Sequence, residues 1–169
     1  MTTSADEHFL RLTFKLALKA RQHGADPFGA VLVHDGTVVA QDRDRSVEAS
    51  DPTYHAELAV ISAYCRENHA FSLEGFTLYA SVEPCMMCAG AIYWARISRV
   101  VFGAPQTVLQ QMTGGTPKPS CESILNMGGK RRVEVVGPLL LDEALAVFEG
   151  YVWTPRLARH RQLFGTGLS

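Results

Sequence analysis

Residues 76–96 read FTLYASVEPCMMCAGAIYWAR, and this stretch decides the fold. Its first half is a short apolar run with β-branched and aromatic residues, which is typical of a buried strand. Pro84 suits the first position of a helix, where its missing N–H costs nothing, and the predicted helix then continues through Arg96. The stretch therefore predicts a strand followed directly by a helix, with Cys85 and Cys88 in the first turn of that helix.

Upstream, three further elements are expected before this unit. Apolar residues at helical spacing predict an amphipathic helix over 9–22, and two β-branched runs around Asp35-Gly36 predict a hairpin of two strands. Pro52 disfavours a helical backbone at the residue before it, so the next helix is expected to begin close to His55 and to reach Arg66.

Downstream, the pattern predicts two more strands and a last helix. These elements cover residues 98–104, 131–139 and 141–153. The residues 104–130 between the two strands have weak periodicity and many glycines and prolines; a connection of this length is usually functional, partly helical or mobile. Strands separated by helices imply partly parallel pairing, so we expect one domain over 1–169, an α/β fold in the form of a three-layer α/β/α sandwich with a central five-stranded mixed sheet.

The composition excludes several classes of protein. The chain has 169 residues, 47% apolar and 20% charged, which is a normal globular balance. There is no uninterrupted apolar stretch of about 20 residues, and acidic residues stand near the N-terminus where a secretory signal would be basic, so a cytoplasmic protein is expected. The net charge of −1 (16 basic and 17 acidic residues) gives no general attraction for nucleic acid.

Four cysteines in a reducing compartment are unsuited to a disulfide framework. The close pair Cys85 and Cys88 is left with metal binding, redox chemistry or packing as its role. Cys65 and Cys121 have no comparable partner, so we assign them to packing.

Adding His55 to the two thiols favours a catalytic zinc site. Catalytic zinc uses three protein ligands and keeps a fourth position for water, whereas a structural site is normally closed by a fourth ligand that this sequence does not supply. The ligands are expected at helix N-termini, where the helix dipole lowers the pKa of a thiol. Glu57, two residues after His55, is the natural proton carrier.

The motifs HAE (55–57) and PCMMC (84–88) resemble the signature of zinc deaminases, H-x-E…P-C-x-x-C. The resemblance to the zinc-dependent cytidine/deoxycytidylate deaminase superfamily covers most of 27–104. Within it the chain is similar to the branch of guanine deaminase, fungal-type cytosine deaminase and bacterial tRNA adenosine deaminase. The resemblance implies a cytidine deaminase-like fold, a Zn²⁺ cofactor held by His55, Cys85 and Cys88, and a homodimer.

The resemblance also implies a mechanism in which zinc acidifies a bound water and Glu57 removes its proton. Hydroxide then attacks the ring carbon that bears the exocyclic amine, Glu57 protonates the ring nitrogen and the leaving amine, and ammonia is released. By the same resemblance, the backbone carbonyl of Glu83 orients the amine and the N–H of Ala56 binds the ring.

Three residues bear on the substrate. Phe28 and Trp94 look more like guanine deaminases than like the tRNA enzymes at the equivalent positions, which suggests a free base against aromatic walls. Asp44 stands where this branch usually has a base-reading asparagine, and an ionised carboxylate can only accept hydrogen bonds. We therefore expect a free amino-substituted nucleobase or related heterocycle that offers an N–H or O–H group to Asp44. The structural alternative for Asp44 is a salt bridge to Arg43, Arg45 or another basic group.

Two other functions are open at this stage. A tRNA wobble adenosine deaminase is the first alternative, because ARISRVVFGA (95–104) looks close to those enzymes and TPRLARHRQ (154–162) is a basic cluster that could contact phosphates. A zinc-stabilised scaffold that has lost catalysis is the second, and Glu57 argues against it. Otherwise the C-terminal arginines are expected to be solvated. Tyr151 and Trp153 are expected to pack in the core; the alternative is that they close the pocket from the C-terminus, as C-terminal residues do in relatives.

Overall fold

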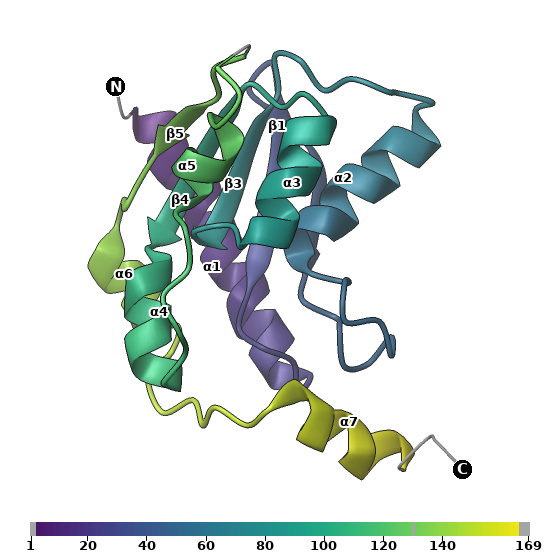
Figure 1. The fold of residues 1–169 in the computed structure, drawn as a ribbon, viewed down its shortest axis with the longest axis vertical. Helices are drawn as coiled ribbons and strands as arrows, with labels where there is room; N and C mark the ends of the chain where they lie inside the picture. The colour runs from purple at the N-terminus through teal and green to yellow at the C-terminus, as the bar shows by residue number, and fades with distance from the viewer. Residues whose placement is uncertain (1–2, 130, 166–169) are drawn as a thin grey trace.

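The computed structural model describes residues 3–129 and 131–165, which form three layers around a five-stranded sheet (Figure 1). The strands lie in the order β2-β1-β3-β4-β5. Their bounds are β1 Gly29–His34, β2 Thr37–Arg43, β3 Thr77–Val82, β4 Arg99–Ala104 and β5 Glu134–Val136. The helices are α1 Ser4–Gln22, α2 Ala56–Glu67, α3 Met86–Trp94, α4 Gln106–Thr113, α5 Cys121–Leu125, α6 Leu141–Ala146 and α7 Arg156–Phe164.

The sheet is mixed, as the sequence predicted. β1 pairs antiparallel with both β2 and β3, whereas β3, β4 and β5 are parallel. The hairpin turns at Asp35-Gly36, where both residues have positive φ angles of 48° and 71°. Positive φ at both central residues is the backbone of a type I′ turn, which matches the twist of the two strands.

Helices cover both faces of the sheet and bury two separate apolar clusters. On one face α1 and α6 pack against a cluster that includes Val31, Tyr79 and Val101; on the other, α2, α3 and α5 pack against a cluster that includes Leu32 and Val100. The alternation along β1 explains this division, since successive side chains of a strand point to opposite faces. The prediction of a three-layer α/β/α sandwich is confirmed.

Gly29 allows α1 to approach the start of β1 closely. A Cβ atom at this position would lie 2.4 Å from the carbonyl oxygen of Thr13 and 2.6 Å from Cβ of Leu16. Any larger residue would push the helix away from the sheet. This close packing matters for function because β1 begins at the wall of the pocket described below.

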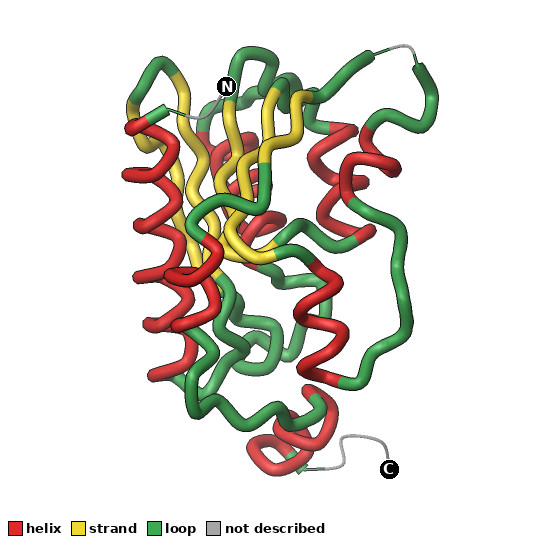
Figure 2. The backbone as a smooth tube through the Cα atoms, turned by 90° about the vertical axis from the view of Figure 1, so that its left-hand side faces the viewer, coloured by secondary structure: helices red, strands yellow, loops and turns green. Residues whose placement is uncertain are grey.

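Several boundaries differ from the expectation: α1 begins at Ser4 rather than at residue 9, and β5 covers only Glu134–Val136 of the predicted 131–139. The helix after β3 begins at Met86 with Cys85 as its N-cap, two residues later than Pro84. The predicted helix over 141–153 ends at Ala146, and a separate α7 follows at the end of the molecule beyond the sheet (Figures 1 and 2). Periodicity could not predict α7 because none of its residues is fully buried.

The long connection over 104–130 contains two helices, α4 and α5, and only Lys130 at its end lies outside the described residues. Helix α4 lies at the same end of the molecule as α7, which is at the bottom of the view next to the C-terminus (Figure 2). None of the helices within the described ranges combines the length and the apolar character needed to cross a membrane.

Candidate active site

His55, Cys85 and Cys88 meet where two helices begin. His55 is the N-cap of α2, Cys85 is the N-cap of α3, and Cys88 lies one turn further along α3. Neither N-cap side chain bonds to its own helix, so the imidazole and the thiol are free to turn toward each other. The sequence predicted both helix starts to within two residues. That the three residues meet was expected from the ligand chemistry of zinc and from the resemblance to zinc deaminases.

The three candidate ligand atoms have the spacing of a tetrahedral zinc site. The Sγ atoms are 3.6 Å apart, and Nδ1 of His55 lies 3.7 Å from Sγ of Cys85 and 3.5 Å from Sγ of Cys88. With Zn–S of about 2.3 Å and Zn–N of about 2.0–2.1 Å, tetrahedral angles give edges of about 3.8 Å and 3.6 Å. The side chains therefore fit zinc without rearrangement, and this is the group among the described residues whose donor atoms could hold a metal.

The thiols share a proton unequally. The S–H of Cys88 donates to Cys85 and, although burial opposes ionisation, this bond and that from His55 lower the pKa of Cys85 to about 3. The pKa of Cys88 is raised, because its ionisation would remove that hydrogen bond and place a second anion in a buried site. A cation would have to be present for both sulfurs to be thiolates, which is the state that zinc requires.

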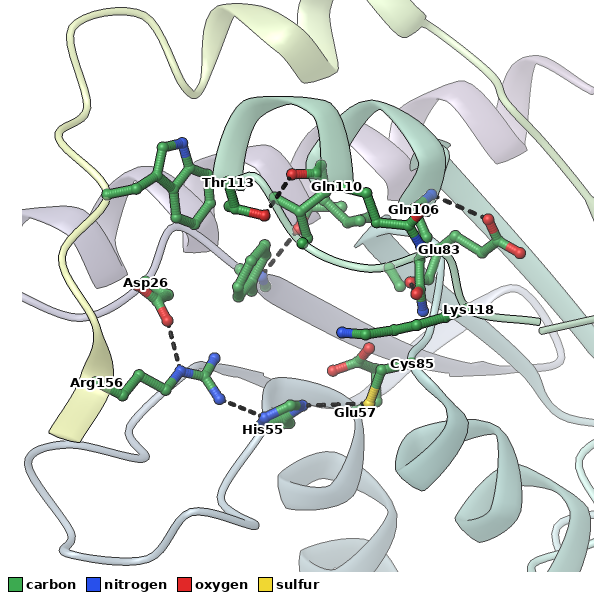
Figure 3. Close-up of a pocket in the computed structure, with 18 of the residues that line it drawn as sticks. Asp26, His55, Glu57, Glu83, Cys85, Gln106, Gln110, Thr113, Lys118 and Arg156 are labelled. Atoms are coloured by element: carbon green, nitrogen blue, oxygen red, sulfur yellow. Dashed lines mark hydrogen bonds and ion pairs between the residues drawn. The ribbon is translucent and has the colours of Figure 1, made fainter. Parts of the chain in front are cut away.

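Glu57 lines the same cavity as His55 and Cys85, two of the three candidate ligands (Figure 3). Its side chain is buried in the first turn of α2, two residues after His55. Burial raises the pKa of its carboxyl group, against the effect of the nearby His55. A carboxyl group of raised pKa can take up and release a proton near neutral pH.

The cavity has a volume of about 390 Å³, which is the size of a small-molecule site. One wall is aromatic: Phe28 and Trp153 both line it, with their ring centroids 6.1 Å apart. Helix α4 and the loop after it form another wall through Gln106, Gln110 and others. The segment 104–130 is thus partly helical and contributes to the pocket, and Trp153, which the sequence analysis assigned to the core, lines it.

Glu83 fastens this second wall to the metal-binding helix. Its carboxylate accepts hydrogen bonds from the backbone N–H groups of Gln106 (3.0 Å) and Cys121 (2.8 Å), the first residues of α4 and α5. Its backbone carbonyl accepts a hydrogen bond from Nε2 of Gln106 at 3.3 Å. The family resemblance implied a role only for the backbone carbonyl of Glu83. No local sequence pattern predicts that its side chain binds the first residues of two helices.

Asp44 is fully buried and is not part of the pocket wall. One oxygen accepts hydrogen bonds from Ser46, and the other accepts from Nη2 of Arg156 at 2.8 Å. Of the two roles considered for Asp44, the structure shows the ion pair, and the partner is Arg156 rather than Arg43 or Arg45. Burial raises the pKa of Asp44, while the charge of Arg156 opposes that effect.

Arg156 is the functional candidate that sequence reasoning missed. It opens α7, lines the cavity, and bonds to Asp26 through Nε (2.5 Å) as well as to Asp44 (Figure 3). Its Nη1 lies 2.5 Å from Nε2 of His55. The expectation that the C-terminal arginines are solvated is wrong for Arg156 and for Arg159, which also bonds to Asp26. Neither a motif nor a helical period links residue 156 to residue 55.

The two remaining residues of the predicted site, Ala56 and Trp94, differ in their position relative to the cavity. Ala56 opens α2 directly after His55. Trp94 is not brought to the pocket: it lies at the far end of α3, 80% exposed. Six residues separate it from Cys88, which at 100° per residue places it about 120° away around the helix and about 9 Å along it. Cys65 and Cys121 lie outside the thiol pair, as expected.

Two thiols and an imidazole leave one tetrahedral position for water or substrate, and a buried carboxyl group lines the cavity beside His55 and Cys85. This is the arrangement of a metal-dependent hydrolase built on an α/β/α sandwich.

Comparison with known proteins identifies the family. Residues 3–104 match the model of the cytidine and deoxycytidylate deaminase zinc-binding region, and the chain therefore belongs to this deaminase family. Guanine deaminase of Bacillus subtilis (strain 168) is 42% identical over 102 residues, which are 60% of this chain and 65% of that protein, slightly under two thirds. A probable cytosine deaminase of Schizosaccharomyces pombe is 35% identical over 150 residues, covering 86% of this chain and 91% of that protein.

A solved structure of a tRNA:A34 deaminase, described as editing adenosine to inosine at the wobble position, has a TM-score of 0.70 and 33% sequence identity. The matched region covers 83% of this chain and 99% of the tRNA:A34 deaminase chain. The names of these relatives thus refer to different amino-substituted bases, so they do not determine the substrate of this protein.

Proposed function

We propose that this protein is a zinc-dependent hydrolytic deaminase of a free amino-substituted nucleobase or related heterocycle. The observation that carries the proposal is that the Glu57 carboxyl group lines the same cavity as His55 and Cys85, two of the three residues whose donor atoms could hold a metal, the third being Cys88. Zinc at those ligands would acidify a water molecule in the fourth position. A scaffold protein has no use for a buried carboxyl group beside such a site.

The proposed reaction replaces the ring amine by an oxo group. The oxygen of water bonds to the ring carbon, the C–N bond breaks, and ammonia leaves. Glu57 takes a proton from the water, delivers it to the ring nitrogen, and then carries the second proton to the departing amine. The backbone carbonyl of Glu83 is proposed to orient that amine, and the N–H of Ala56 is proposed to bind the ring.

A free base is supported by the shape of the pocket. Phe28 and Trp153 provide an aromatic wall on which a flat ring can stack. Arg156 and Arg159, which in the sequence looked available for phosphates, are instead bonded to Asp26 and Asp44. This leaves the basic C-terminal cluster much reduced as a surface for RNA.

The alternative is a tRNA wobble adenosine deaminase, and the observation in its favour is the 33% identity to the tRNA:A34 deaminase structure. One experiment decides between the two. Ammonia release by the zinc-loaded protein is measured on guanine, cytosine, adenine, their nucleosides and a wobble-adenosine stem-loop, with Glu57→Gln as the control. Release from a free base that is lost in the control supports our proposal, and release from the stem-loop alone would refute it.

We also propose a homodimer, in which α3 contributes to the interface. Met86 and Trp94 of this helix and Met127 after α5 are exposed apolar side chains. Contact with a second copy would bury these side chains, because exposed apolar side chains can mark interaction sites. Light scattering should give twice the chain mass, and Trp94→Asp should give the monomer mass; a monomeric unmutated protein would refute this assignment.

A further inference from the structure

The proposed reaction assigns no role to Arg156, although its guanidinium lines the cavity. The described residues that line the cavity include two basic side chains, Arg156 and Lys118. Lys118 is exposed on the loop after α4. Arg156 is only 30% exposed and comes from the opposite side, from the first residue of α7 (Figure 3).

Two buried carboxylates hold the guanidinium in one orientation. Nε donates to Asp26 at 2.5 Å and Nη2 donates to Asp44 at 2.8 Å, and both aspartates are at most 5% exposed. Asp44 is itself fixed by Ser46, which donates from its backbone N–H and its hydroxyl group. The remaining nitrogen, Nη1, is directed at His55.

The hydrogen bond from Nη1 of Arg156 to His55 can form in only one of the two neutral tautomers of the histidine. A guanidinium can only donate hydrogen bonds, so Nε2 of His55 can accept from it only while the ring proton is on Nδ1. Nδ1 is also the atom that faces the two thiols. If a metal binds Nδ1, the neutral imidazole carries its proton on Nε2. The N–H of Nε2 then faces the N–H of Arg156 Nη1, and two donors cannot form a hydrogen bond. Nη1 then needs a new acceptor, and the adjoining space is the cavity.

The charge around Arg156 indicates what kind of acceptor fits. Arg156 and Arg159 are matched by Asp26 and Asp44, so the cluster has no net charge. A balanced cluster does not require an anion as its ligand. A neutral carbonyl oxygen suits a preorganised N–H better.

We propose that Arg156 is a specificity-determining residue that donates a hydrogen bond from Nη1 to a ring oxo group of the substrate. The inference rests on the proposed function and narrows it to amino-oxo heterocycles, which carry a carbonyl as well as the amine that leaves. Adenine and adenosine have no such carbonyl. A hydrogen bond to a charged group of this kind corresponds to a preference of about 10- to 100-fold.

The test compares substrates that differ by one oxygen. The zinc-loaded protein is assayed on two pairs of compounds: guanine with 2-aminopurine, and cytosine with 4-aminopyrimidine. For the pair that reacts faster, kcat/KM of the oxo compound is divided by kcat/KM of the compound without the oxygen. We expect the oxo compound to be preferred, and Arg156→Gln to reduce that ratio about 10- to 100-fold. Arg159→Gln is the matched control, because Arg159 also anchors α7 to Asp26 but does not line the cavity. It should leave the ratio unchanged.

A binding measurement separates this inference from the proposed function. In zinc-loaded Glu57→Gln, calorimetry should show guanine or cytosine bound more weakly when Arg156→Gln is added, with no change for the partner that lacks oxygen. Selective weakening without ammonia release from any base in the active protein would support the role of Arg156 and refute the deaminase. Ammonia release with an equal loss for both members of a pair would overturn the inference and leave the deaminase standing. Absence of both binding and release would overturn both.

Discussion

Asp44 and Arg156 are 112 positions apart in the chain, and their side chains meet at 2.8 Å between Oδ2 and Nη2. The carboxylate is fully buried, so this contact fixes the start of α7 against the loop after β2. The partner guanidinium keeps about a third of its surface in solvent, which reduces the strength of the pair below that of a fully buried one.

Asp44→Asn should destabilise the protein. The amide removes one charge from the pair, whereas Asp26 still holds Arg156. We expect a loss in the free energy of unfolding below the roughly 3–5 kcal/mol of a fully buried broken pair, measured by urea denaturation. Asp42→Asn is the control, because Asp42 pairs with Arg45, whose side chain is partly exposed. An equal effect of both variants would contradict the structural importance of the Asp44 contact.

Removal of one metal ligand should abolish zinc binding. Cys88→Ala leaves two ligands, and the remaining Cys85 thiolate loses the S–H donor that lowers its pKa. Zinc content measured by atomic absorption should fall from stoichiometric to near zero, and ammonia release should fall with it. Cys65→Ala removes a cysteine that is not part of the ligand group and should retain zinc. Full zinc occupancy in Cys88→Ala would rule out this ligand set.

Glu57→Gln should separate metal binding from catalysis. The amide has nearly the shape of the carboxyl group but cannot carry the proton between water and substrate. We expect kcat to fall by about 10²- to 10⁴-fold while the zinc content stays unchanged. Single-turnover kinetics on the best substrate would show the loss in the chemical step. Normal kcat in a fully folded variant would exclude Glu57 as the proton carrier.

Glu83→Gln tests the anchor of the second pocket wall. The carboxylate accepts from two backbone N–H groups, whereas a glutamine can offer one of them only an NH₂ donor. An unsatisfied buried donor costs about 1–3 kcal/mol, so both the unfolding free energy and the affinity for substrate should decrease. Glu122→Gln changes an exposed carboxylate of α5 and serves as the control. A KM and stability equal to those of the unmutated protein would show that the anchor is dispensable.

Acid should lower the stability of the protein through Asp6, which does not line the candidate active site. Burial alone would raise the pKa of Asp6, but hydrogen bonds from Arg99 and Tyr79 outweigh it and lower the pKa well below its usual value. The folded protein therefore binds fewer protons here than the unfolded chain. This contribution to stability is complete above the unfolded pKa of about 3.9 and is lost as the pH falls below it toward the folded pKa.

Asp6→Asn should remove that part of the pH dependence. We expect the variant to be less stable at pH 7, toward the lower end of about 3–5 kcal/mol, and to lose less stability than the unmutated protein between pH 5 and pH 3. Urea denaturation at the two pH values measures both effects. Parallel pH profiles for the two proteins would show that Asp6 does not carry the acid sensitivity.

The sequence by itself determined the metal centre and the architecture. Pro52 and Pro84 mark where α2 and α3 begin, and hydrophobic periodicity marks the strands and most helices that surround them. These are local signals: a proline restricts the backbone next to it, and a cysteine three positions from another lies one helical turn away. The convergence of His55 with Cys85 and Cys88 was expected on other grounds: the ligand chemistry of zinc and the resemblance of the two motifs to zinc deaminases.

Which side chains line the cavity depends on the tertiary structure. Arg156 and Trp153 reach the cavity from a segment without apolar periodicity, and Trp94 turns away although its sequence context suggested the pocket. The side chain of Glu83 finds the starts of α4 and α5, the latter 38 positions later. Such contacts depend on how distant segments fold back on one another, and the chain carries no local signal for them because each residue alone could equally be solvated.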